Sequence, residues 1–144
     1  MEEALREAQV AAERGEVPVG AVAVLDGRVL ARGHNQVELL HDATAHAEML
    51  VITAAEEALE NWRLEGVDLY VTLEPCAMCA GAMVNARVSR IVYAADDPIA
   101  GACGTVFNIV AEPKLNHRIP VVKGMMAGRA GALLKDFFRS RRKK

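Results

Sequence analysis

The sequence predicts an α/β domain in which helices cover both faces of one mixed β-sheet. Its length of 144 residues is that of a single domain and is enough to bury a core. Helical and strand-like segments alternate along the chain, which is typical of a sheet layered between helices. The run Ala-Val-Ala-Val at 21–24 is almost continuously apolar, as expected for a strand that is covered on both faces.

The chain begins with an amphipathic helix and a β-hairpin. Residues 2–14 have the periodicity of a helix with one apolar face. That face is made of Ala4, Leu5, Ala8, Ala11 and Ala12. Strands are expected over 19–25 and 28–33, because the first run is almost entirely apolar and Asp26-Gly27 between the two is a common hairpin turn.

A polar loop and a second helix follow the hairpin. The loop covers 36–43, and Thr44 after it is a candidate N-cap for a helix over 45–60. Apolar residues recur at helical spacing within this helix and predict its buried face. They are Met49, Ile52, Ala55 and Leu59.

The second half supplies the remaining strands and two further helices. Strands are expected over 67–73, 90–94 and 119–122, and helices over 76–85 and 125–142. A flexible loop covers 96–105, and 106–110 is expected to be a short helix or turn. The apolar residues of the last helix that should pack on the sheet are Leu133, Leu134, Phe137 and Phe138.

Composition narrows the class of protein. Hydrophobic residues make up 52% of the chain, which argues against disorder. Three cysteines, two of them in Cys-x-x-Cys, do not suggest a secreted disulfide framework. The N-terminus is acidic and lacks the apolar segment of a signal peptide, and no apolar run approaches the length of a membrane span. We therefore expect a cytoplasmic protein with no membrane partner.

Charge is distributed unevenly although the net charge is only -2. Residues 135–144 contain six basic residues against one acidic residue, Asp136, and they include the pair Phe137-Phe138. Such a terminus could contact nucleic acid. Taken without the other motifs, however, it is better explained as a solvated helix end, where cations are favoured in any case.

Three residues have the types and spacing of a catalytic metal site. Cys76 and Cys79 are three positions apart, so on a helix both sulfurs can reach one point. His46 would add a nitrogen ligand. Three protein ligands with one open position are typical of catalytic zinc, whereas structural zinc takes a fourth protein ligand. Water in the open position would be activated at neutral pH.

Glu48 is the candidate general acid and base. It lies two residues after His46, in the expected first turn of the helix, where side chains can flank a group beyond the helix end. A carboxylate there can move protons without binding the metal. A thioredoxin-type redox role is the alternative for Cys-x-x-Cys, but such a motif has no use for His-x-Glu.

The full pattern resembles a known family. His-x-Glu at 46–48 with Pro-Cys-x-x-Cys at 75–79 is the signature of zinc-dependent nucleobase deaminases of the cytidine and deoxycytidylate deaminase superfamily. The bacterial tRNA-specific adenosine deaminases are similar over nearly the whole chain. The further segments that carry this resemblance are 16–21, 33–35, 41–48, 115–118 and 136–142.

The resemblance implies a fold, a reaction and partners. It implies that residues 1–144 form one zinc-dependent deaminase domain of the CMP/dCMP type, with a three-layer α-β-α fold around a mixed five-stranded sheet. The implied reaction is hydrolytic deamination of adenosine to inosine at the wobble position of tRNA anticodon loops. One Zn²⁺ per chain, the tRNA anticodon stem-loop as substrate and a homodimer are implied as well.

The resemblance also assigns residue roles. Glu48 would be the proton shuttle, and His46, Cys76 and Cys79 would bind the metal. The substrate contacts that it implies are Asn35, Ala47, Pro75, Asp97, Phe138 and Arg141.

Two alternative functions remain open from the residues. A deaminase of free cytosine, guanine or dCMP would share the same zinc core, and only the basic tail and Asn116-His117-Arg118 favour tRNA. A zinc-stabilised RNA-binding module without catalysis would have no use for Glu48 or for an open metal position.

Overall fold

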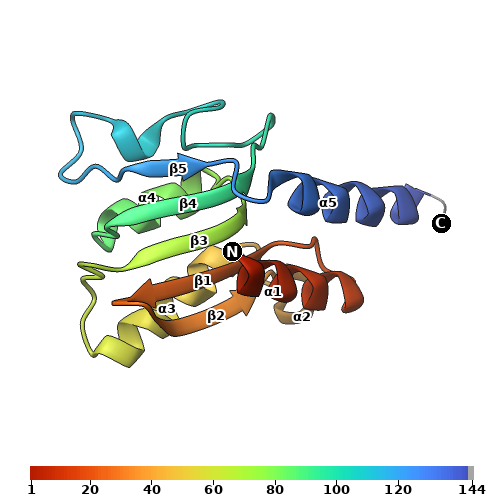
Figure 1. Ribbon diagram of the computed structural model, residues 1–144, viewed down its shortest axis with the longest axis horizontal. Coiled ribbons are helices and arrows are strands. Elements are labelled where there is room, and N and C mark those ends of the chain that lie inside the picture. The colour runs from red at the N-terminus through yellow and green to blue at the C-terminus, as the bar shows by residue number, and fades with distance from the viewer. Residues whose placement is uncertain (143–144) are drawn as a thin grey trace.

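A computed structural model of the chain describes residues 1–142. Within this part, five strands form one sheet in the order β2-β1-β3-β4-β5 (Figure 1). The strands are β1 (Gly20–Leu25), β2 (Arg28–His34), β3 (Asp68–Leu73), β4 (Arg90–Ala95) and β5 (Val121–Lys123). Strand β1 is antiparallel to β2 and β3, whereas β3, β4 and β5 run parallel. The predicted mixed five-stranded sheet is confirmed.

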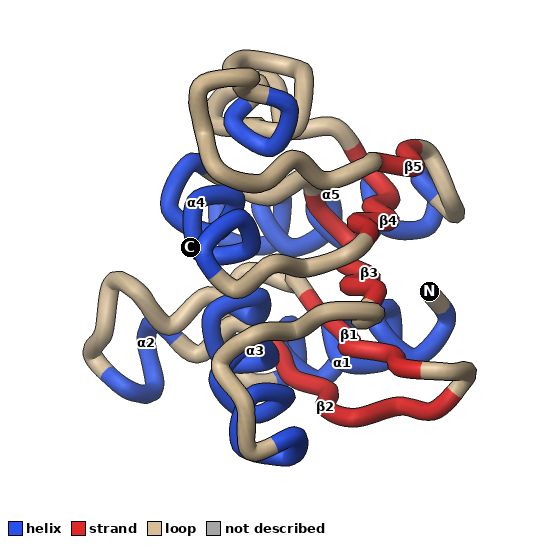
Figure 2. Tube along the Cα trace, turned by 90° about the vertical axis from the view of Figure 1, so that its left-hand side faces the viewer, coloured by secondary structure: helices blue, strands red, loops and turns tan. Residues whose placement is uncertain are grey.

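Helices cover both faces of the sheet, as Figure 2 shows. The helices are α1 (Glu2–Glu13), α2 (Val37–Leu40), α3 (Ala47–Leu59), α4 (Ala77–Asn85), α5 (Ala127–Arg142) and the 3-10 helix η1 (Ile109–Ala111). Helices α3 and α4 pack on one face, and α1 and α5 pack on the other. This is the predicted three-layer α-β-α arrangement.

The alternation of strand side chains explains the two hydrophobic clusters. Alternate residues of the central strands point to α3 and α4 and form the main core. They include Ala21, Ala23, Leu69, Val71, Ile91 and Tyr93. On the opposite face, Ala94 of β4 packs with Leu5 of α1 and Ala130 of α5. A sheet buried on both sides needs nearly continuous apolar strands, and the Ala-Val run of β1 meets that need.

The hairpin turn was predicted correctly from its two residues. Asp26 and Gly27 both have positive φ, at 50° and 76°. A two-residue turn of this kind matches the twist of antiparallel strands and favours Asp-Gly or Asn-Gly.

The segment before α3 differs from the prediction. The expected loop over 36–43 contains the short helix α2. Helix α3 begins at Ala47, with His46 rather than Thr44 at the N-cap. The Asp42 Oδ1 atom accepts hydrogen bonds from the backbone N–H and the hydroxyl of Thr44, at 2.8 and 2.7 Å. Thr44 therefore belongs to a local turn and does not cap the helix.

The C-terminal third also differs in detail. Strand β5 begins two residues later than expected, at Val121. The short helix expected within 106–110 is η1, which covers 109–111. Leu133 packs against the α1–α5 cluster as predicted. Phe138 does not pack on the sheet, since 44% of its surface is exposed. None of the helices within 1–142 combines the length and the apolar character that crossing a membrane requires.

Candidate metal centre and substrate cavity

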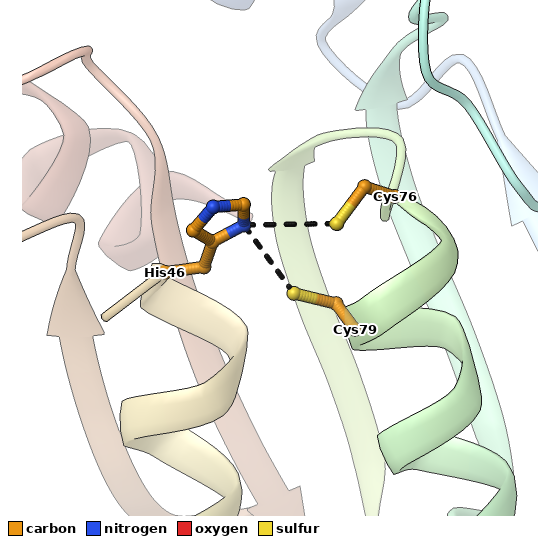
Figure 3. A group of neighbouring side chains, drawn as sticks. All are labelled: His46, Cys76 and Cys79. Carbon is orange, nitrogen blue, oxygen red and sulfur yellow. Dashed lines mark hydrogen bonds between the residues drawn. The ribbon is translucent and has the colours of Figure 1, made fainter. Parts of the chain in front are cut away.

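His46, Cys76 and Cys79 converge on one point, as the sequence predicts (Figure 3). The His46 Nδ1 atom lies 3.7 Å from the Cys76 sulfur and 3.5 Å from the Cys79 sulfur. The three ligand atoms all lie within 4.8 Å of one another. One nitrogen and two sulfurs at this spacing could hold a metal ion.

The starts of two helices bring these ligands together. His46 is the N-cap of α3 and Cys76 is the N-cap of α4, and both have extended backbone conformations. Neither side chain makes a capping hydrogen bond to the start of its helix. Both are therefore free to turn toward each other, while Cys79 reaches the same point from the first turn of α4. The positive ends of the two helix dipoles favour negative charge there.

The two thiols differ in acidity. Hydrogen bonds from the Cys79 thiol and from His46 lower the pKa of Cys76 to about 3, so that Cys76 is a thiolate at neutral pH. Sharing this hydrogen bond, together with burial, raises the pKa of Cys79. The bond to Cys76 raises the pKa of His46. A thiolate is the form of cysteine that binds metal.

Glu48 is buried beside the ligand cluster, with only 4% of its surface exposed. Burial raises the pKa of its carboxyl group to about 7. Glu48 does not belong to the group of ligand atoms that converge. A carboxyl group that titrates near neutral pH can accept a proton and return it, as a general acid and base does.

A cavity of about 510 Å³ opens onto this cluster. Most of the predicted site residues line it. They are Asn35, His46, Ala47, Glu48, Cys76, Asp97, Phe138 and Arg141. Cys79 and Pro75 are buried and do not line it. Its size is in the range of small-molecule sites.

Asn35 has the only buried side-chain nitrogen or oxygen without a hydrogen-bond partner in the described part of the chain. Its Nδ2 atom donates to the Val17 carbonyl at 3.4 Å, and its Oδ1 atom has no partner. Because buried polar atoms are normally paired, this oxygen is available to a donor on a bound molecule. The neighbouring His34 instead pairs with Glu7 at 3.0 Å, away from the cavity.

Asp97 and Pro75 have local partners. The Asp97 Oδ1 atom accepts from the backbone N–H groups of Ile99 and Ala100, at 3.0 and 3.1 Å. The Pro75 carbonyl accepts from Ala102 at 2.8 Å. The loop after β4 is thereby joined to the turn that carries Cys76.

The end of α5 closes one side of the cavity. The Arg141 guanidinium donates to the Gly15 carbonyl and lies over the Phe137 ring, 4.7 Å from its centroid. The Phe137 and Phe138 rings meet edge to face with centroids 5.4 Å apart. Lys143 and Lys144, the last members of the predicted basic terminus, lie outside the described residues.

Two buried carboxylates at the cavity were not among the predicted site residues. The Glu16 carboxylate accepts from the backbone N–H groups of Glu38 and Leu39, at 3.0 and 2.8 Å, and so stabilises the start of α2. Glu74, at the end of β3, accepts from the loop after β4. For Glu74, the sequence did offer a signal, because this acidic residue directly follows an apolar strand and precedes Pro75.

Comparison with known proteins gives consistent matches. The MafB19-like deaminase family matches residues 1–142. A tRNA-specific adenosine deaminase from Bacillus subtilis (strain 168) is 52% identical over 144 residues, which is 100% of this chain and 89% of the relative. A structure from a study of A-to-I editing by tRNA:A34 deaminases superposes with a TM-score of 0.90 at 50% identity, covering 93% of this chain and 97% of that chain. A guanine deaminase from Nitrosomonas europaea has a TM-score of 0.81 over 94% of this chain and 81% of that chain, but at 23% identity it shares the fold alone.

Proposed function

Because this chain belongs to the family of tRNA-specific adenosine deaminases, we propose that it converts adenosine to inosine at the wobble position of tRNA anticodon loops. In this reaction adenosine and water give inosine and ammonia. The observation that carries the proposal is the convergence of His46, Cys76 and Cys79 beside the buried Glu48, at the base of a cavity. Residues 1–144 would form one deaminase domain.

The ligand cluster fits zinc. With usual bond lengths, nitrogen and sulfur ligands of tetrahedral zinc lie about 3.6 Å apart. The two distances from the His46 nitrogen, 3.7 and 3.5 Å, agree with this value. Imidazole and thiolate are also ligands that zinc prefers and that magnesium and calcium do not. One bound zinc ion per chain would supply a water molecule activated for attack on C6 of adenine.

Glu48 would move the protons of the reaction. Its carboxylate would accept a proton from the attacking water and deliver it to a ring nitrogen of adenine. It would then take the proton of the newly added hydroxyl group and pass it to the amino group, which leaves as ammonia. The burial that brings the pKa of Glu48 to about 7 suits both directions of transfer near neutral pH. The surrounding apolar wall would keep bulk water away from these steps.

Other cavity residues would bind and orient the nucleoside. The Asn35 Oδ1 atom would accept a hydrogen bond from the substrate. The Ala47 backbone N–H lies in the first turn of α3, where amides have no partner within the helix. We infer that Asp97 contributes to the substrate site as part of the cavity wall. Pro75 would act indirectly, by holding the adjoining loop, because its carbonyl is bonded to Ala102.

The end of α5 would contact the RNA. The Phe138 ring is exposed at the cavity and could stack on a base, while Arg141 would face the phosphates. An anticodon loop suits this site because its bases leave their stack more easily than bases in a duplex. A tRNA substrate also implies a cytoplasmic enzyme.

We further propose that the protein acts as a homodimer. Several large apolar side chains outside the cavity are exposed, and they include Trp62, Val106 and Phe107 at 55%, 44% and 53%. A second copy that covered them would remove this apolar surface from water. Light scattering of the purified protein tests this part of the proposal.

A direct assay separates the proposed reaction from deamination of a free base or nucleotide. The zinc-loaded protein should form inosine in an anticodon stem-loop with adenosine at the wobble position, as detected by nucleoside mass spectrometry. It should leave free adenosine, guanine, cytosine and dCMP unchanged. Deamination of a free base or nucleotide with an untouched stem-loop would contradict the proposal.

Metal analysis tests the ligands in the same preparations. The Cys76→Ser variant should lose bound zinc and activity. The matched control Cys103→Ala changes a buried cysteine that is not part of the ligand cluster and should keep one zinc per chain. Zinc bound equally by both variants would exclude Cys76 as a ligand.

A further inference from the structure

Glu74 is a buried carboxylate whose hydrogen bonds all go to one loop. Only 2% of its surface is exposed. Its Oε1 atom accepts from the Asp97 backbone N–H at 3.0 Å and from the Thr105 hydroxyl. Its Oε2 atom accepts from the backbone N–H groups of Cys103 and Thr105, at 3.0 and 3.2 Å. The carboxylate thus joins both ends of the segment 97–105.

This segment forms part of the cavity wall. Asp97 and Ala100 line the cavity together with the ligand residues His46 and Cys76. The loop backbone approaches Glu74 so closely that a Cβ atom on Gly101 would lie 2.4 Å from the carboxyl carbon. The loop therefore folds around the carboxylate, and its shape depends on that group.

Two backbone hydrogen bonds also join this part of the chain to the turn that carries Cys76. The Glu74 backbone N–H donates to the Ala95 carbonyl at 2.8 Å, and the Ala102 N–H donates to the Pro75 carbonyl at 2.8 Å. Cys76 follows directly in the chain. Glu74 thus lies between the turn that carries Cys76 and the 97–105 loop of the cavity wall. It is not one of the three residues that converge as possible metal ligands.

We propose that Glu74 is a positioning residue for the deamination, which acts by holding the 97–105 loop in its substrate-binding shape. This inference rests on the proposed function. The site needs a carboxylate because all four groups that point to it are donors, and an ionised carboxylate has only acceptors. Glutamine would place an amide N–H₂ group against at least one of these donors, and it would lose the charge that strengthens the bonds.

Two variants and one control test the proposal. Glu74→Gln keeps the size of the side chain but removes acceptors and charge. Thr105→Val removes a single hydroxyl donor and leaves the backbone bonds in place. The control Asp68→Asn changes a partly exposed carboxylate at the other end of β3, which pairs with Arg90 at 2.8 Å. All three are zinc-loaded and assayed on the anticodon stem-loop.

We expect Glu74→Gln to raise KM roughly tenfold, since one charge-assisted hydrogen bond is worth about that factor in an equilibrium. Thr105→Val should raise KM by about threefold, and Asp68→Asn should leave it unchanged. In all three, kcat and zinc content should stay close to those of the parent. A role in folding alone would lower the midpoint of thermal unfolding but would not raise KM of the folded enzyme.

Amide hydrogen exchange gives a readout that is independent of activity. Peptides covering 97–105 should exchange faster in Glu74→Gln than in the parent, and those from β1 should not. An unchanged KM with unchanged exchange would overturn the proposal, and so would a loss of zinc with an unaltered loop. If the parent itself fails on the stem-loop, the proposed function fails, and the exchange comparison still decides whether Glu74 holds the loop.

Discussion

Replacing Glu48 with glutamine should abolish turnover and at the same time stabilise the metal-free protein. The two effects have one physical cause. Glu48 is 4% exposed, and burial raises the pKa of its carboxyl from the ordinary value of 4.5 to about 7. Glutamine has the same size and fits the same space, but it neither ionises nor carries a proton between water and substrate.

The size of the stabilisation follows from the pKa of Glu48. The folded chain keeps the proton up to about pH 7, whereas the unfolded chain releases it near pH 4.5. The folded state therefore binds more protons between these values, and its stability falls as pH rises through this window. The gap of about 2.5 pH units, at 1.36 kcal/mol each, amounts to roughly 3 kcal/mol above pH 7. The Gln variant avoids this cost, so its gain in the free energy of unfolding over the parent should be large at pH 8 and small at pH 5.

Thermal unfolding of the metal-stripped proteins measures this difference. At pH 8 we expect Glu48→Gln to unfold about 5–10 °C above the parent, and the gap should narrow toward pH 5. Comparing the two proteins at each pH largely removes the contribution of other titrating groups. The zinc-loaded variant should keep one zinc per chain, while kcat falls at least about 10³-fold. An advantage independent of pH would refute the burial argument, and zinc loss would show that Glu48 is a ligand.

Three further predictions concern the cavity and its thiols. In metal-stripped protein at pH 7, iodoacetamide should modify Cys76 before Cys103, because Cys76 is a thiolate whereas burial raises the pKa of Cys103 to about 12. Peptide mass spectrometry measures the order of modification, and bound zinc should protect Cys76. Asn35→Ala should raise KM for the stem-loop by up to about tenfold with zinc content unchanged, as steady-state kinetics would show; an unchanged KM would exclude a substrate contact. Phe138→Ala should weaken stem-loop binding by about tenfold in fluorescence anisotropy, since stacking on one base is worth about 1–3 kcal/mol, and equal affinity would place the RNA elsewhere.

The convergence of His46, Cys76 and Cys79 could be predicted, as could the sheet, because the signals for both are local. Cys76 and Cys79 are one helical turn apart, and the strand, proline and helix around them are short-range patterns. His46 and Glu48 also lie within one turn, so a small error in the start of α3 did not separate them. The two strands of the hairpin are joined by a turn whose residues dictate its backbone conformation.

Two of the missed features depend on contacts between distant residues. Helix α2 spans four residues and is stabilised by Glu16, which precedes Glu38 by 22 positions. Glu74 gains its role only when the loop from Asp97 folds back over it. No pattern of neighbouring residues encodes these two arrangements. Thr44 was misassigned for a local reason, because it forms a turn with Asp42 and helix α3 begins only at Ala47.

The placement of the ligands at helix starts divides the domain into a constrained end and a permissive end. Helix α3 carries His46 at its N-cap and extends 13 residues away, about 20 Å, to Leu59. Helix α4 likewise leaves the cluster from Cys76 and ends at Asn85. Insertions after either helix would leave the reacting groups in register, whereas one extra residue between His46 and Glu48 would not. The end of the domain where α3 and α4 finish is thus where substitutions, affinity tags or fused domains should be best tolerated.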